Sequence, residues 1–270
     1  MSDEVSAGVA PPSDAARTGG WVHPRRYAGL ISVLAGLALW ELTSRVLIDN
    51  TLFLAAPSQI ARAILGLARS GELWRHLWVS GREFAIGYVL ASVLGILLGL
   101  ALAGNEVRRA ALQPWVSGFY ATPTIALAPL FILWTGIGIW SKILVVVSLV
   151  IFPVAINTEA GLRTTSARLI EMLRSFGANR RQIFLKLSLP SAIPFILAGL
   201  KLGIGRGLIG VVVGELFGAR AGLGQLITQS AEAFDMPDLF AGVVVLAVAG
   251  IGLTACFSWI ERRAVPWTQD

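Results

Sequence analysis

Six long runs of apolar residues divide this chain, and each has about the length that a helix needs to cross a lipid bilayer. The runs are continuous in their apolar character instead of alternating, a pattern typical of membrane helices and not of membrane β-barrel strands. The predicted spans cover residues 27–48, 80–103, 114–133, 140–156, 192–217 and 239–260. The pattern therefore predicts an all-α integral membrane protein with about six transmembrane helices.

One segment outside the spans has a helical pattern of its own. Residues 58–76 place Arg62, Arg69, Glu72 and Arg75 among isoleucines and leucines. This mixture is typical of an amphipathic helix that lies on a membrane surface. Residues 218–238, with Glu232, Asp235 and Asp238, are interpreted as a polar loop.

The third predicted span contains three prolines, at positions 114, 123 and 129. Proline bends a helix and frees backbone carbonyls, which a membrane protein tolerates only where protein or water covers the defect. We therefore expect this span to be bent, with protein or water covering the defect.

The composition supports a chain dissolved in lipid. Hydrophobic residues make up 55% of the 270 positions, charged residues only 14%, and the mean hydropathy is +0.72. These values exclude a soluble enzyme and a disordered protein. The single cysteine, Cys256, excludes an intramolecular disulfide and a metal site built on cysteines.

The net charge of +6 is explained by membrane topology more simply than by nucleic-acid binding. Basic residues are concentrated in the N-terminal tail, in residues 104–113 and 157–188, and in the C-terminal tail, 13 in all. Six fall on the other side: Lys142, Arg220, and Arg62, Arg69, Arg75 and Arg82 in and just after the amphipathic segment. Cytoplasmic loops carry an excess of Lys and Arg. We therefore predict that both termini are cytoplasmic, with residues 1–26 a disordered tail, 27–263 the transmembrane domain and 264–270 a second tail.

The segment from residue 167 to residue 190 is too ordered for a plain connection. Leu169, Ile170, Leu173 and Phe176 share one face of a first helix, and Ile183, Phe184 and Leu187 form a second stripe. Gly177 stands where a helix end often needs a left-handed residue, and Asn179 can cap the next helix. The segment predicts two short basic amphipathic helices, which would either lie on anionic lipid or dock another protein.

The spacing of this segment resembles a known motif. Glu171-Met172-Leu173 is followed after three residues by Gly177, and after nine more by Leu187-Ser188-Leu189-Pro190. The cytoplasmic loop of permease subunits in binding-protein-dependent ABC importers has Glu-Ala-Ala, three residues, Gly, nine residues and Ile-x-Leu-Pro. The departures at Met172, Leu173 and Leu187 remain apolar.

Further stretches over about residues 30–267 resemble the nitrate/sulfonate/taurine/bicarbonate branch of this family. They are residues 56–58, 95–100, 129–138, 211–217 and 222–224. The resemblance implies a type I ABC importer permease-like bundle with cytoplasmic coupling helices, in which the coupling loop spans residues 157–190 and contacts a separate ATPase. The residues implied in this contact are Glu171, Met172, Leu173, Arg174, Gly177, Arg180, Arg181, Leu187, Leu189 and Pro190.

The same resemblance implies the partners and the cellular location of the chain. The implied partners are an ABC ATPase subunit, an extracytoplasmic substrate-binding protein and a second copy of the chain. The implied location of the chain is the bacterial plasma (inner) membrane, where it contacts lipid. The chain has no Gly-x-x-x-x-Gly-Lys-Ser/Thr run, so ATP and Mg would be bound by the partner ATPase and this chain would need no cofactor of its own. We expect no catalytic residue, no metal site and no nucleic-acid partner.

Three charged residues fall within the fifth span: Lys201, Arg206 and Glu215. A charge in a span normally faces protein or water. Either Arg206, with Lys201, lines the pathway and attracts an anion, or Lys201 reaches the inner interface and Arg206 pairs with another helix. In the first span, Glu41 and Arg45 are four residues apart and are expected to pair.

Glycines recur every four residues at 95 and 99, at 199, 203 and 207, and at 210 and 214. This spacing lets helix backbones approach closely, so the fifth span is predicted to lie at the centre of the bundle. His23 and His76 are interpreted as isolated residues near the interfaces.

The resemblance to ABC importer permeases implies ATP-driven import of a small anionic solute, with an aliphatic sulfonate or taurine preferred over nitrate. An ion-gradient-driven secondary transporter is the alternative, and Glu215 is its one candidate for the buried acid it would need. A membrane assembly subunit without transport is a third interpretation, but it leaves the prolines and charges within the spans unexplained.

Overall fold

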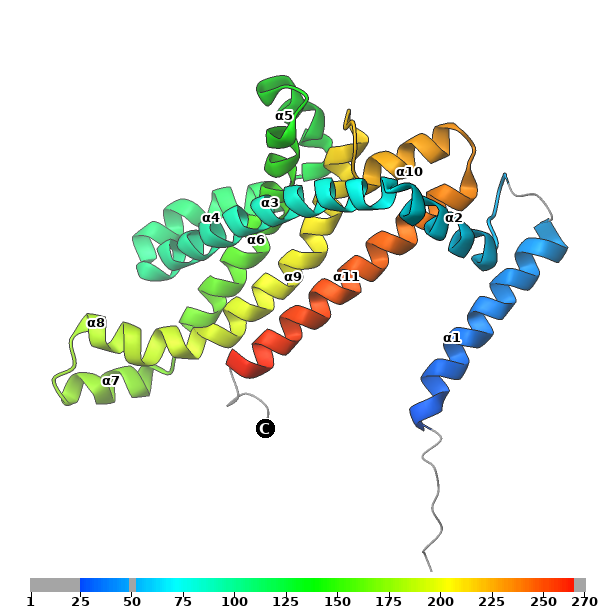
Figure 1. Cartoon of the computed structure of the whole chain (residues 1–270). Helices are drawn as coiled ribbons and strands as arrows, with labels where there is room; N and C mark the ends of the chain where they lie inside the picture. The colour runs from blue at the N-terminus through cyan, green and yellow to red at the C-terminus, as the bar shows by residue number, and fades with distance from the viewer. Residues whose placement is uncertain (1–24, 49–51, 265–270) are drawn as a thin grey trace, which may run out of the picture.

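The computed structural model describes residues 25–48 and 52–264, and helices make up nearly all of this part of the chain. In chain order (Figure 1) they are α1 (Arg25–Leu42), α2 (Pro57–Ser70), α3 (Glu72–Gly104), α4 (Glu106–Ala121), α5 (Ala128–Thr135), α6 (Ile139–Arg163), α7 (Ala167–Ser175), α8 (Arg180–Ile183), α9 (Leu189–Leu216), α10 (Leu223–Glu232) and α11 (Met236–Ala264). Among the described residues, five helices are long and apolar enough to cross a membrane, or up to six if one bent pair counts as a span.

The bent pair occupies the third predicted span. The prediction of one bent helix over residues 114–133 is wrong in degree, because α4 ends at Ala121 and α5 leaves at 84°. Pro123 stands at the break, and Thr122 before it has ψ 132°. A proline ring pushes the preceding residue out of the helical region, so the chain turns here instead of curving.

The centre of the bundle is α6, which packs between α3 and α9. Glycines make this possible: a Cβ atom on Gly95 would lie 2.7 Å from the carbonyl oxygen of Ile151, and one on Gly210 would lie 3.0 Å from the Cα atom of Val146. The predicted close packing is confirmed, and the glycines of α9 at 199, 203, 207, 210 and 214 face α3 or α6 of the same chain. The predicted place of this span at the centre of the bundle is wrong, because α6 lies there and one face of α9, with Leu202 and Ile209, is exposed. Val146, Val150 and Val154 of α6 fill the space between the helices.

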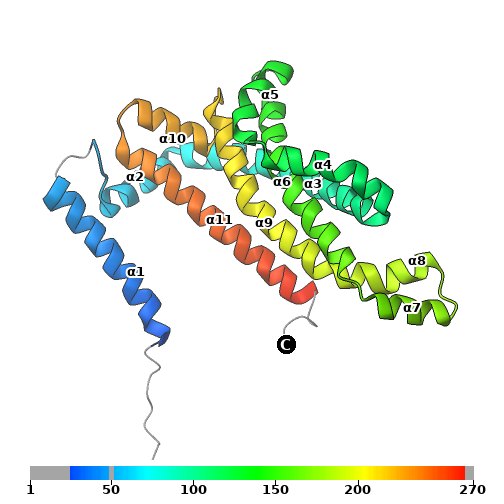
Figure 2. The ribbon, with the colours of Figure 1, turned by 180° about the vertical axis from the view of Figure 1, so that it is seen from behind.

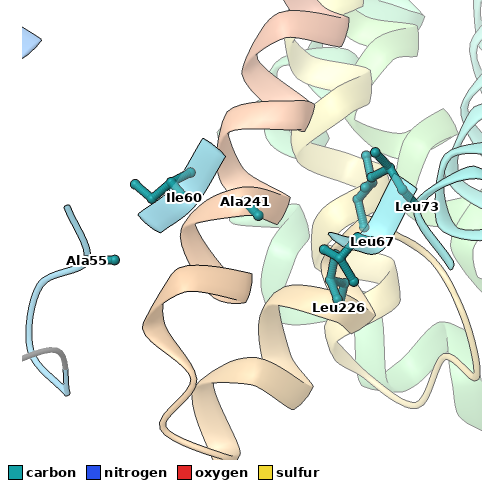
Figure 3. Close-up of a cluster of buried hydrophobic side chains, with 7 residues drawn as sticks. Ala55, Ile60, Leu67, Leu73, Leu226 and Ala241 are labelled. Atoms are coloured by element: carbon teal, nitrogen blue, oxygen red, sulfur yellow. The ribbon is translucent and has the colours of Figure 1, made fainter. Parts of the chain in front are cut away.

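A second apolar cluster joins α2 to α10 and α11. Ile60 and Leu67 of α2 are buried with Leu226 of α10 and Ala241 of α11, as Figure 3 shows. The amphipathic pattern of α2 is confirmed, but its apolar face packs on protein instead of facing only the membrane surface. The predicted segment 58–76 also ends too late, because Gly71 at φ +85° stops α2 and α3 begins at Glu72.

Several other boundaries differ from the prediction. The interval 218–238, interpreted as a loop, contains α10 and the first residues of α11. The interval 157–188 is shorter as a connection, because α6 continues to Arg163 and a π-helical turn, Phe184–Ser188, joins α8 to α9 without interruption. The residues of a helix beyond its apolar run are polar, so hydropathy predicts these helices to be shorter than they are.

Helix α1 stands apart from the bundle in both views (Figures 1 and 2). The predicted pair is confirmed: Arg45 Nε lies 2.6 Å from Glu41 Oε1. The Glu41 carboxylate also accepts hydrogen bonds from the backbone N–H of Ser58 at 3.0 Å and from its hydroxyl at 2.8 Å. These contacts tie the end of α1 to the start of α2, while the apolar side chains of α1 remain largely exposed.

Candidate functional site

Two regions of the structure carry candidate functional residues, at opposite ends of the bundle. The first is an arm made of α7, α8 and the turn between them, which projects beyond the other helices (Figures 1 and 2). We call this end of the bundle the α7 end, and the opposite end, where α10 lies, the α10 end.

The turn of the arm is closed by backbone and side-chain hydrogen bonds. Gly177 has φ +78°, and the N–H of Ala178 donates to the carbonyl oxygen of Leu173 at 3.0 Å. The side chain of Asn179 accepts from the backbone N–H of Gln182 at 2.9 Å, and Gln182 Oε1 accepts from the N–H of Asn179 at 2.8 Å. The left-handed glycine and the Asn179 cap are both confirmed.

The arm exposes an apolar face to its surroundings. No residue of α7 is buried, and Met172 and Phe176 are 48% and 81% exposed. Of the residues implied in ATPase contact, Glu171, Arg174, Arg180 and Arg181 are exposed on the arm and Leu173 is half-buried. Leu187, Leu189 and Pro190 lie half-buried where α8 runs into α9, at the base of the arm.

The three charged residues of the fifth span do not form one site. Lys201 Nζ lies 3.2 Å from Glu261 Oε2 of α11. Arg206 lies on an exposed face of α9 beside Tyr120 and Phe152, and it has no ion pair within the described part of the chain. Glu215 is fully buried near the α10 end.

Glu215 belongs to a buried polar cluster, which we call the Glu215 cluster. It consists of Ser80 and Glu83 of α3, Lys142 of α6, Glu215 of α9 and the backbone of residues 222–224. Ser80 Oγ donates to Glu215 Oε1 at 2.6 Å, and the N–H of Gly224 donates to Glu215 Oε2 at 2.6 Å. The N–H of Leu223 in turn donates to Ser80 Oγ at 2.8 Å. Both carboxyl oxygens of Glu215 therefore have a donor, as a buried polar group requires.

Glycines give this cluster its room. A Cβ atom on Gly222 would collide with the carboxyl group of Glu215, and one on Gly224 would lie 3.0 Å from Glu215 Oε2. Gly214 lies against the stem of Lys142, where an added Cβ would come within 3.2 Å of the lysine Cβ and Cγ atoms. The sequence pattern Gly214-Glu215 followed by Gly222-Leu223-Gly224 thus encodes the contact of α9 and α10 with α3 and α6.

The sequence-based interpretation is wrong for two residues of this region. His76 is not isolated: it is 3% exposed, and its Nδ1 atom lies 3.0 Å from the nitrogen and 2.8 Å from the oxygen of Gly222. Lys142 is not a loop residue, because it is buried within α6 with its Nζ atom 3.5 Å from Glu83 Oε1. Polar residues that face inward inside an apolar run have no periodic signal of their own, so only the glycine pattern could have indicated their packing.

The arrangement provides packing, charge and hydrogen bonds, but no catalytic group stands out. Within residues 25–48 and 52–264, no three His, Cys, Asp or Glu side chains are grouped to hold a metal ion. The arm can dock another chain, and the Glu215 cluster fixes the α10 end.

Comparison with known proteins agrees with this architecture. Residues 91–270 match the family described as binding-protein-dependent transport system inner membrane component. The chain is 37% identical to the formylaminopyrimidine transport permease protein ThiX of Halalkalibacterium halodurans over 231 residues, which cover 86% of this chain and 92% of the relative. It is 31% identical to the putative aliphatic sulfonates transport permease protein SsuC of Bacillus subtilis, with 99% and 98% covered.

The fold also matches a solved structure. A chain of the MetNI methionine ABC transporter, in inward-facing conformations, superposes with a TM-score of 0.56 at 22% identity. The match covers 74% of this chain and 96% of that chain. The expected type I permease bundle is confirmed at the level of the fold.

Proposed function

The chain belongs to the family of binding-protein-dependent transport system inner membrane components, and we propose that it forms the solute pathway of an ATP-driven importer of small anions. Family membership makes it a multi-pass permease subunit of an ABC importer.

The arm of α7 and α8 is the proposed contact with the ATPase. The observation that carries the proposal is an exposed apolar face on a tightly capped turn that continues directly into α9. An exposed apolar patch of this kind marks an interaction site. Gly177, Glu171 and Pro190 would shape the arm, and Arg174, Arg180 and Arg181 would make charge contacts with the partner.

The helix that begins at Arg180 gives the arm a direct mechanical link to the membrane domain. It runs to Leu216 as one 37-residue helical unit, about 55 Å long at 1.5 Å per residue. A movement of the arm when the ATPase closes would therefore reach the α10 end through one element. ATP and Mg would be held by the ATPase, and this chain would contribute no cofactor.

The proposed orientation places the α7 end and both termini in the cytoplasm of a bacterial cell, with the α10 end on the outer side of the plasma (inner) membrane. An extracytoplasmic binding protein would deliver solute to the α10 end. The basic character of the arm supports this orientation, because cytoplasmic segments are enriched in Arg and Lys.

A second copy of the chain is the proposed cover for the open face of α9. Leu202, Arg206 and Ile209 share this face and are exposed. A guanidinium group within a span is costly to place against lipid, so its face is expected to meet protein or water. In a homodimer the two open faces would enclose the pathway, and Arg206 would attract the anion.

The solute is proposed to be a small anion, with an aliphatic sulfonate or taurine ahead of nitrate. Arg206 and the similarity to SsuC support this choice. The similarity to ThiX, whose name gives a formylaminopyrimidine as its solute, makes an uncharged pyrimidine the competitor to test. A secondary transporter is not favoured, because Glu215 is the penultimate residue of α9 and both of its oxygens have donors.

The test compares Gly177→Val with Gly177→Asn. Valine at a positive φ costs about 1–2 kcal/mol and distorts the turn, whereas asparagine tolerates this conformation. The chain is first purified in mild detergent, and co-purifying proteins are identified by mass spectrometry. Vesicles containing the recovered complex and its binding protein are then assayed for ATP-dependent uptake of ethanesulfonate.

We expect a P-loop ATPase to co-purify with the wild type and with Gly177→Asn, and to be lost with Gly177→Val. Uptake should follow the same order, while the amount of chain inserted in the membrane stays constant. Recovery of the chain without an ATPase, or unchanged uptake by Gly177→Val, would contradict the proposal.

A further inference from the structure

A cavity of about 370 Å³ lies at the α10 end, next to the Glu215 cluster. Its walls come from α3, from the first turn of α6 and from the segment of residues 218–221 that follows α9. Arg82, Glu83, Lys142 and Arg220 line it, so three cations and one carboxyl group share a single space.

The cations have hydrogen-bonding capacity to spare. Arg82 and Arg220 are exposed, and neither makes a hydrogen bond or ion pair within the described part of the chain. Lys142 is 7% exposed, and its ammonium group has three donors, of which Glu83 at 3.5 Å can take one. The cavity thus offers several N–H donors that carry positive charge and have no protein acceptor.

The start of α6 adds to the same field. Gly138 is its N-terminal capping residue and, like Ile139 and Lys142 of the first turn, lines the cavity. The first backbone N–H groups of a 25-residue helix carry partial positive charge and favour an anion. The basic side chains and the N-terminal end of α6 therefore both favour an anion in the cavity.

Membrane topology does not explain this basic cavity. The α10 end is opposite the basic arm, and an excess of Arg and Lys is expected on the cytoplasmic side alone. The three cations around the cavity at the other end outnumber its one carboxyl group, Glu83, so an excess of positive charge is left that a further anion would neutralise. Binding of an anion is a physical role that fits their position around one cavity.

We propose that this cavity binds one oxyanion group. The group would be carried either by the arriving solute or by an acidic side chain of the protein that delivers it. The inference rests on the proposed function only for the side of the membrane that the cavity faces. Glu83 holds Lys142 in place, and Arg82 and Arg220 contact the anion from the mouth of the cavity.

The experiment measures binding to the purified full-length chain by isothermal titration calorimetry, in a buffer of constant ionic strength. Ethanesulfonate represents the free solute, and N-acetylglutamate amide represents an acidic protein side chain. The variants are Arg82→Gln, Arg220→Gln and their combination, because both arginines are exposed and their removal leaves no buried charge without a partner. Arg69→Gln, an exposed arginine of α2, is the matched control.

We expect the affinity to fall about tenfold or more in the double variant and to stay unchanged in Arg69→Gln, since charge-assisted hydrogen bonds are lost only in the former. Binding of ethanesulfonate supports the site with the solute as its source, and binding of N-acetylglutamate amide alone supports it with a protein side chain. Absence of binding for both probes, or equal affinities in all variants, would overturn the proposal. Because no ATPase takes part, the result is independent of the test of coupling.

Discussion

At the scale of single residues, the carboxyl group of Glu215 depends on donors that arrive from two other parts of the chain. Ser80 supplies one from α3 and Gly224 supplies the other from α10. A polar group buried without partners costs several kcal/mol on transfer scales, so these bonds decide whether Glu215 stabilises or destabilises the α10 end. Ser80 is the central member, since it also accepts from Leu223.

Ser80→Ala is expected to lower the free energy of unfolding by about 1–3 kcal/mol, because it leaves an acceptor on Glu215 and the N–H of Leu223 without a partner. Thermal unfolding of the detergent-purified protein measures the change. Ser191→Ala is the control, since this serine is exposed and bonds only the preceding turn of its own helix. Equal losses in the two variants would mean that the Glu215 cluster adds no specific stability.

At the scale of helices, the contact between α6 and α9 is set by backbone proximity. Glycine every four residues on α9 permits this contact, and the repeat is visible in the sequence alone. The same is true of the α7–α8 turn, where Gly177 and Asn179 specify the local conformation. The glycine repeat and the turn are local patterns, which is why close packing of α9 and the shape of the turn can be predicted from the sequence, whereas α6 as the partner of α9 cannot.

Other helical features depend on contacts between distant segments and cannot be predicted in this way. Helix α10 is only ten residues long, and its apolar face is buried because it shares a cluster with Ile60 and Leu67 of α2. The partnership of Ser80 with Glu215 spans 135 positions and has no local signature. The prolines indicate a bend near Pro123, but the size of the bend depends on how α5 packs after the turn.

Gly210→Ala is expected to destabilise the protein by about 1–3 kcal/mol, because the added methyl group meets the backbone of α6 and a backbone cannot rotate away. The new Cβ atom would lie 3.0 Å from the Cα atom of Val146. Gly252→Ala on α11, where nothing lies within 4 Å, should instead leave stability unchanged or raise it through helix propensity. Denaturation of both variants in the same detergent provides the comparison, and a stable Gly210→Ala would show that α6 and α9 separate easily.

At the scale of the entire fold, two of the apolar surfaces that the described residues expose differ in what can cover them. One is α1, which stands away from the bundle, and the other is the open face of α9 around Arg206. Lipid can cover the first surface, but the charge on the second calls for protein or water. The homodimer proposed above makes a geometrical prediction at this scale.

Ile209→Cys, in a chain whose native Cys256 is replaced by serine, is expected to form a disulfide-linked dimer on oxidation in native membranes. The reason is that a face shared by two copies brings identical positions close to the symmetry axis. Val89→Cys is the control, because this residue is 60% exposed but belongs to α3, outside the open face of α9. Non-reducing electrophoresis measures the product, and equal cross-linking at both positions would count against a specific interface.

The wide separation of the partners in the Glu215 cluster has a consequence for biosynthesis. Glu83 enters the membrane with α3 long before the ribosome has made Lys142 on α6. Glu215, the partner of Ser80, is made 135 residues after Ser80. Through that interval the nascent N-terminal half carries polar groups that nothing yet satisfies. Its maturation therefore awaits the arrival of α9 and α10, and chains terminated before Glu215 are expected to be cleared by membrane quality control instead of accumulating as stable fragments.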